Sequence, residues 1–172
     1  GKIAWSMEFV ESLKVPSILF AVYCPTRSRS LGTLIRTASA CGAKMLVIVG
    51  ENKVGFHGAF GSNTRIMILH FYTWPEAISF LQSKRHMVYF YGVSPPGLED
   101  KSCQSLKACE FPMLTESDSV CFVVGARAEP LSAEILSFVD ISIKIDFPVA
   151  KFAKMLQFEE AFAIAIHHYV SS

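Results

Sequence analysis

The final helical stretch of the chain carries the acidic and basic side chains that first suggest chemistry. Glu159 and Glu160 are followed by His167 and His168, and carboxylates with imidazoles can bind a metal or exchange a proton. On a helix, Glu160 and His167 share a face but lie about 10.5 Å apart along the axis, too far for one metal ion. No Glu-x-x-His or His-Glu-x-x-His spacing occurs. We therefore predict no metal site and interpret the histidines as helix-end residues favoured by the helix dipole.

Arginines supply the second group of side chains that could do chemistry. Arg27 and Arg29 lie in C-P-T-R-S-R-S-L-G, and Arg36 follows in L-G-T-L-I-R-T-A. Arg65 follows a Gly-rich segment farther along the chain. Guanidinium groups bind phosphate through charge and paired hydrogen bonds, so these residues are candidates for contact with RNA. A solvated basic loop remains the alternative for Arg27 and Arg29, and an ordinary surface ion pair remains the alternative for Arg36.

Aromatic residues gather in sequence around Arg65, and their rings could stack on nucleobases. This set comprises Phe56, Phe60, Phe71, Tyr72 and Trp74. Packing in the core or in a dimer interface is the interpretation that we favour for them.

The composition limits the class of protein. Of the 172 residues 51% are hydrophobic, and the mean hydropathy is +0.36, which predicts that the surplus apolar surface goes into a core or into a partner interface. No apolar run reaches the ~18 residues of a membrane span, so we expect no membrane segment. The formal net charge of +1 gives no polybasic field, and any RNA role must depend on local clusters.

The cysteines indicate the redox compartment. The five cysteines are odd in number and show no C-x-x-C spacing, so we interpret them as reduced thiols, with Cys41 and Cys121 in the core. This predicts an intracellular protein of the cytoplasm or of an organellar matrix. No signal peptide is visible at the start of the sequence.

Short apolar runs alternate with helical patterns along the chain and predict its elements. Strands are expected at Ser17–Tyr23, Lys44–Gly50, Ile66–Phe71, Met87–Val93, Val120–Gly125 and Ile141–Ile145. Helices are expected at Leu31–Gly42, Pro75–Lys84, Ser132–Phe138 and Lys154–Tyr169. Continuous apolar strands between amphipathic helices indicate an α/β fold, a mostly parallel sheet with helices on both faces. No linker or repeat divides residues 1–172, which we interpret as a single domain, with 1–15 an N-terminal helix trimmed from a longer RNA-binding extension.

In such sheets ligands bind beyond the carboxyl ends of the strands. The loops after Tyr23, Gly50, Val93, Gly125 and Ile145 are therefore the candidate binding loops. No G-x-G-x-x-G follows the first strand and no G-x-x-x-x-G-K-[ST] occurs, which disfavours dinucleotide-binding and P-loop proteins.

Three segments in order resemble the motifs of one known family. They are L-G-T-L-I-R-T-A-S-A-C-G-A (31–43), V-V-G-A-R-A-E-P-L-S (123–132) and F-P-V-A-K-F-A-K-M-L-Q-F-E-E-A-F-A-I-A-I (147–166). Together they resemble the SpoU/TrmH family of RNA 2′-O-ribose methyltransferases, part of the SPOUT superfamily. The resemblance implies a C-terminal deep trefoil knot, S-adenosylmethionine (SAM) as cofactor, and rRNA or tRNA as substrate. It also implies a homodimer or heterodimer that forms through the C-terminal helix.

The resemblance assigns candidate roles to individual residues. Arg36 would activate or position the ribose hydroxyl, and Gln157 falls where the family has an Asn, so both are candidate catalytic residues. Candidates for SAM contact are Val93, Gly125, Ala126, Ile145, Phe147, Val149 and Leu156. Candidates for RNA contact are Arg27, Arg29, Ser30, Arg65 and Arg127.

Several positions depart from the family pattern. The family's Glu in the second motif falls on Arg127, and its Ser in the third motif falls on Met155. Lys151 replaces a small residue, and we expect its side chain to crowd or cover the cofactor pocket. The scaffold positions Gly32, Gly42, Gly125, Pro148 and Leu156 are kept. Two interpretations stay open: a working methyltransferase, or a catalytically inactive pseudoenzyme that binds RNA or assists ribosome assembly.

Overall fold

The structure is a computed structural model that describes residues 17–23, 31–50, 66–84, 87–125 and 129–172. Its strands are β1 (Ser17–Tyr23), β2 (Met45–Val49), β3 (Met67–Phe71), β4 (Met87–Val93), β5 (Gln104–Ser105), β6 (Asp118–Gly125) and β7 (Ile141–Lys144). Its helices are α2 (Leu31–Ala40), α3 (Trp74–Lys84), the 3₁₀ turn η2 (Leu106–Ala108), α4 (Ala133–Phe138), α5 (Ala150–Ala153) and α6 (Phe158–Ser171). The six predicted strands and the first three predicted helices are present, whereas β5, η2 and α5 were not expected.

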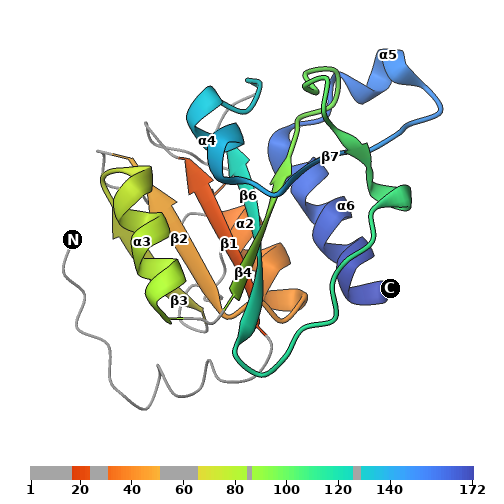
Figure 1. The fold of residues 1–172 in the computed structure, drawn as a ribbon. Coiled ribbons are helices and arrows are strands. Elements are labelled where there is room, and N and C mark those ends of the chain that lie inside the picture. Colours follow the sequence, from red (N-terminus) through yellow and green to blue (C-terminus); the bar gives the residue numbers. More distant parts are fainter. Residues whose placement is uncertain (1–16, 24–30, 51–65, 85–86, 126–128) are drawn as a thin grey trace.

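The seven strands form one parallel sheet in the order β3-β2-β1-β6-β4-β7-β5. β1 lies at its centre, where Phe20 is in register with Leu46 of β2 and with Phe122 of β6. The prediction of an α/β domain with a parallel sheet is confirmed. Because the strands are parallel, all their carboxyl ends meet at one edge, which is the upper edge for β1, β2 and β6 in Figure 1.

Helices cover both faces of the sheet, as the continuous apolar strands predicted. Alternate residues of β1 point to opposite faces: Phe20 belongs to a core that contains residues of α2 and α6. Leu19 belongs to a second core, with residues of α3 and α4. Phe20 packs its ring on Phe162 of α6 at 5.4 Å between centroids, which fixes the last helix on the sheet.

Local sequence explains two helix boundaries. Gly42 follows α2 with φ of +85°, a left-handed conformation that glycine adopts without strain, so the predicted stop is confirmed. The Ser132 hydroxyl accepts a hydrogen bond from the Ile135 amide at 3.2 Å and caps the start of α4. Cys121 is buried as expected, but Cys41 is only half-buried.

The C-terminal segment differs from its prediction. A single helix was expected at Lys154–Tyr169, but α5 ends at Ala153 and α6 begins only at Phe158. Gln157 between them is extended, with φ of −87° and ψ of 166°. Its backbone amide donates to the Glu160 carboxylate at 3.0 Å, which satisfies a backbone N–H that the start of the helix leaves without a partner. The apolar helical period of the sequence did not reveal this break.

No helix in the described part of the chain is both long and apolar enough to cross a bilayer. The predicted N-terminal helix at 1–15 lies outside the described residues, as do Phe56 and Phe60.

Candidate cofactor site

A cavity of about 220 Å³ lies at the carboxyl ends of β4 and β7. Its walls come from the segment that follows β4, the segment that follows β7, and α5. The lining residues are Pro96, Gly97, Glu99, Ile145, Asp146, Phe147, Ala150, Ala153 and Lys154. The cavity therefore lies at the sheet edge where a parallel sheet binds ligands.

Hydrogen bonds hold the segment after β4 against β7. The Ser94 amide donates to the carbonyl of Ile143 at 3.0 Å, and the buried Ser94 hydroxyl lies 3.3 Å from the Cys103 thiol. The Cys103 thiol donates to the Asp100 carboxylate at 3.2 Å. Burial raises the pKa of this thiol, so it stays protonated as a donor at neutral pH.

Asp100 is the centre of this set of bonds. Burial alone would raise its pKa, but hydrogen bonds from Ser102, Cys103 and Ser142 outweigh that effect and hold the pKa below its usual value. Ser142 lies in β7, so the carboxylate joins the segment after β4 to the strand beside it. The cavity wall is positioned by a charged group that is ionised at neutral pH.

Gly97 packs closely against the side chain of Lys154 inside the cavity. Its φ is +82°, and its amide donates to the Glu99 carboxylate at 3.1 Å. A Cβ atom added there would lie 2.8 Å from Cγ of Lys154, so the lysine stem occupies the space beside the glycine. This corrects one expectation: Lys151, predicted to crowd the pocket, is exposed with its amine 5.9 Å from the Phe152 ring centroid. Lys154 narrows the cavity instead.

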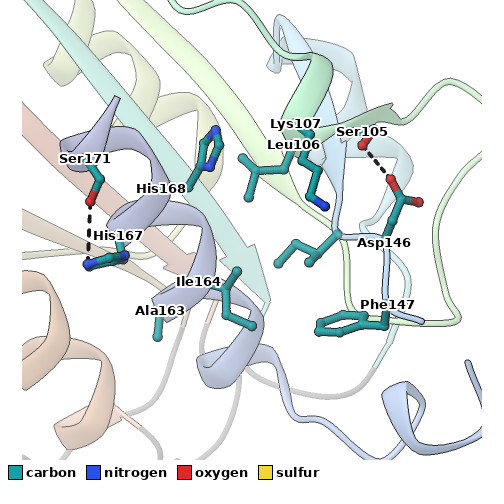
Figure 2. Close-up of a pocket in the computed structure, with 11 residues that line it drawn as sticks. Ser105, Leu106, Lys107, Asp146, Phe147, Ala163, Ile164, His167, His168 and Ser171 are labelled. Carbon is teal, nitrogen blue, oxygen red and sulfur yellow. Dashed lines mark hydrogen bonds between the residues drawn. The ribbon is translucent and has the colours of Figure 1, made fainter. Parts of the chain in front are cut away.

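A larger groove of about 580 Å³ adjoins the cavity and shares Ile145, Asp146 and Phe147 with it. It runs between η2 and α6, and Figure 2 shows Ile164 of α6 on one wall and Phe147 on another. The Ser105 hydroxyl donates to the Asp146 carboxylate at 2.5 Å, which ties β5 to the segment after β7. His167 and His168 line the groove near the end of α6, and no group of three metal-binding side chains occurs within the described ranges.

Of the predicted site residues, Ile145 and Phe147 line the cavity. The other described candidates are not among the cavity-lining residues: Val93, Gly125, Val149, Leu156, Arg36 and Gln157. Val93 and Gly125 lie at the ends of β4 and β6. Arg36 is exposed on α2, and Gln157 is exposed at the start of α6. Outside the described residues lie Arg27, Arg29, Ser30, Arg65, Ala126 and Arg127.

Sequence reasoning missed Gly97, Glu99, Asp146 and Lys154 as residues of the cavity. The loops after Val93 and Ile145 were predicted as binding loops, and the turn signal Pro95-Pro96-Gly97 marks one of them. Lys154 gave no such signal, because only the break between α5 and α6 brings its stem to Gly97.

Comparison with solved structures identifies the architecture. The SpoU methyltransferase AviRb from Streptomyces viridochromogenes, in complex with the cofactor AdoMet, superposes with a TM-score of 0.72 at 16% identity over 91% of this chain. The TrmH/SpoU tRNA modifying enzyme of A. aeolicus superposes with a TM-score of 0.70 at 15% identity over 95% of this chain. An AdoMet-bound rRNA methyltransferase from Sinorhizobium meliloti superposes with a TM-score of 0.68 at 18% identity over 91% of this chain.

The chain has the SpoU/TrmH methyltransferase fold. It spans 58% of the length of AviRb, 80% of the A. aeolicus enzyme and 58% of the S. meliloti enzyme. No family model matches the chain, and no curated protein matches it in sequence. The tertiary structure thus confirms the SpoU/TrmH resemblance that the three sequence motifs predicted, although the overall sequence identities are only 15–18%.

The cavity residues of this SpoU/TrmH fold suit an adenosyl group. Ile145, Phe147 and the alanines of α5 are apolar walls for a planar base. The carboxylates of Glu99 and Asp146 lie at the same cavity and can accept hydrogen bonds from sugar hydroxyls. The residue types therefore suit SAM, whereas the volume of about 220 Å³ is smaller than the ~300 Å³ of ordinary small-ligand sites, with the Lys154 stem occupying part of the space.

Proposed function

We propose that this chain is a SAM-dependent RNA methyltransferase domain that modifies a ribose 2′-hydroxyl of a structured RNA, rRNA or tRNA. The observation that carries the proposal is the cavity at the carboxyl ends of β4 and β7 in a fold shared with AdoMet-bound SpoU methyltransferases. SAM supplies the methyl group on its sulfonium. Gly97, Ile145 and Phe147 would hold the adenosyl group, with Glu99 and Asp146 accepting from its hydroxyls.

The RNA side of the site rests on arginines. Arg36 is exposed on α2, where its guanidinium would hold a phosphate or position the ribose hydroxyl. Arg27, Arg29, Ser30, Arg65 and Arg127 stay proposed RNA contacts. Gln157 stays a proposed catalytic residue; the group that donates to the Glu160 carboxylate at the start of α6 is its backbone amide.

A specific observation favours the second candidate, a non-catalytic RNA-binding or assembly factor. Met155 stands where the family has a Ser, and its side chain is 69% exposed. The Lys154 stem fills space beside Gly97. A domain that keeps this fold but has lost the orienting side chains would bind RNA without transferring a methyl group.

We also propose the knot and the dimer that the resemblance implies. The segment 129–172 would thread through a loop of the chain, and α6 would pair with a second copy or a related subunit. An experimental structure that traces the chain continuously tests the knot.

Two measurements test the proposed function. Calorimetry with SAM at millimolar concentration should give saturable binding, and labelled SAM should transfer its methyl group to RNA as 2′-O-methylated nucleosides. Arg36→Ala should lower the transfer rate by about 100-fold, because a displaced reacting group costs that much, while SAM affinity stays unchanged. Lys44→Ala, an exposed lysine before β2, is the matched control.

The outcomes separate the two candidates. RNA binding without SAM binding or methyl transfer would establish the non-catalytic factor. Full activity of Arg36→Ala would remove the role of Arg36. Absence of both RNA and SAM binding would overturn both candidates.

A further inference from the structure

A second cavity, of about 370 Å³, lies at the carboxyl ends of β1, β2 and β3. It is lined by Tyr23, Val49, Gly50, Tyr72, Thr73, Trp74 and Glu134. These residues come from three strand ends, the start of α3 and the first turn of α4. No lining residue is shared with the cofactor cavity, so this is a separate place on the same edge of the sheet.

Two tyrosines present aromatic surface at this cavity. Tyr23 is 39% exposed and Tyr72 is 54% exposed, although most aromatic rings in the described part of the chain pack in or against the core. Tyr72 lies beside the His70 ring, at 5.2 Å between centroids, and the His70 Nε2 atom lies 2.5 Å from the Gly50 carbonyl oxygen. Trp74 is 3% exposed and packs on Phe138. The cavity thus has a fixed wall and two accessible rings, as a stacking site requires.

Glu134 is the charged side chain among the lining residues of this cavity. Its side chain is exposed at the first turn of α4, and within the described part of the chain its carboxylate accepts no hydrogen bond. The described lining residues include no lysine or arginine. A carboxylate repels phosphate and favours a ligand edge that donates hydrogen bonds.

An unstacked nucleobase has the required chemistry. Proteins recognise single-stranded RNA by stacking splayed bases on aromatic rings and bonding their Watson–Crick edges. Guanine presents two adjacent donors on that edge, which match the two oxygens of a carboxylate as a guanidinium fork does. Cytosine and adenine present a single amino group there, and uracil presents one imino group between two carbonyls. The volume lies within the ~300–1,000 Å³ of ordinary small-ligand sites.

We propose that this cavity binds one unstacked base of the RNA, guanine in preference, stacked on Tyr72 and Tyr23 with its Watson–Crick edge donating to Glu134. The proposal rests on the proposed RNA-binding function and adds the feature by which the RNA is chosen. From the strand order and a spacing of about 4.8 Å per strand, the two cavities lie about 17 Å apart along the sheet edge. The base read here is therefore a different nucleotide from the one that would be methylated.

Binding of short RNAs tests the proposal. Fluorescein-labelled UUGUU should bind the full chain about tenfold more tightly than UUUUU, and UUIUU, in which inosine lacks the 2-amino group, should fall between them. Glu134→Gln should remove the preference for UUGUU over UUUUU. Tyr72→Ala should weaken the binding of UUGUU by about fivefold or more. Tyr72→Phe, which keeps the ring, should bind UUGUU like the wild type. Glu76→Gln, an exposed carboxylate in the first turn of α3 that does not line the cavity, is the matched control.

A measurement on the unaltered protein guards against variants that fail to fold. In the wild type, guanosine monophosphate should shift the amide resonances of Gly50, Tyr72, Thr73 and Glu134. Equal affinity for UUGUU and UUUUU, or shifts confined to the surroundings of Gly97 and Ala153, would overturn the proposal. If RNA binds without base preference, this inference alone fails; if the wild type binds neither RNA nor SAM, the proposed function fails with it.

Discussion

At the residue scale, Lys154 controls the space beside Gly97. Its Cγ lies 2.8 Å from the place of a Gly97 Cβ, and its side chain lines the cofactor cavity. The neighbouring lysine, Lys151, is exposed and lies outside the lining. Two lysines three residues apart therefore make a natural pair for a comparison of cofactor binding.

Lys154→Ala should raise the affinity for SAM by about fivefold. Truncation removes a stem that crowds the cavity, and relief of crowding is worth about 1 kcal/mol. Lys151→Ala should bind SAM like the wild type, and calorimetry measures both. Weaker binding by Lys154→Ala would show instead that the lysine contacts the cofactor.

Gly42 offers a test of backbone conformation free of packing effects. Its φ is +85°, and an added Cβ would meet no atom within 4 Å. Gly42→Ala should lower the free energy of unfolding by about 1 kcal/mol, since alanine is strained in the left-handed conformation and meets no clash. Gly42→Asn should lower the free energy of unfolding by less, because asparagine tolerates that conformation better. Urea denaturation measures both variants. An alanine variant as stable as the wild type would contradict the expectation.

At the scale of elements, the segment after β4 is part of the cofactor cavity only because it is bonded to β7. Asp100 makes that connection through Ser102, Cys103 and Ser142. The break between α5 and α6 is the second such feature, because it brings Lys154 to the same segment. The cavity therefore depends on contacts between elements more than on any single motif.

Asp100→Asn should lower stability at neutral pH by about 1 kcal/mol, the scale of a partly exposed hydrogen bond to a charged group. The pKa of Asp100 is depressed below its ordinary value of 3.8, so its contribution is complete above that value. It is lost as the pH falls through the lower pKa of the folded state. Wild type and variant should therefore converge in strongly acidic buffer. Denaturation measured from pH 7 downward checks this, with Glu76→Gln as a control, and a pH-independent difference would contradict it.

At the scale of the whole molecule, apolar side chains remain uncovered around α5 and α6. Phe152 is 61% exposed, Met155 69%, Ile164 38% and Val170 41%, and Ile164 also lines the groove beside η2 (Figure 2). Exposed apolar surface of this kind is typical of a subunit interface. It agrees with the apolar composition and with the proposed pairing of α6.

The chain should be a dimer in solution, with a mass by light scattering twice the 19.0 kDa of one copy. Ile164→Asp should shift it toward the monomer, because an unpaired carboxylate in an apolar interface costs several kcal/mol. Met113→Asp is the matched control, since Met113 is 96% exposed and lies between η2 and β6. A monomeric wild type at micromolar concentration would overturn the expectation.

The sequence by itself determined the α/β class, the six longer strands and the stop signal at Gly42, just after α2 ends at Ala40. It could do so because strand burial on both faces produces continuous apolar runs, and because a glycine at a left-handed position has a local cause. Ile145 and Phe147 were likewise found from their place after a predicted strand.

Only the tertiary structure decided which side chains meet. Lys154 reaches Gly97, 57 positions away in the chain, because the helix expected at Lys154–Tyr169 breaks before Phe158. Tyr23, Tyr72 and Glu134 share a cavity because the sheet order brings the ends of β1 and β3 beside α4. Such contacts depend on the packing of distant segments, and no local period or motif encodes them.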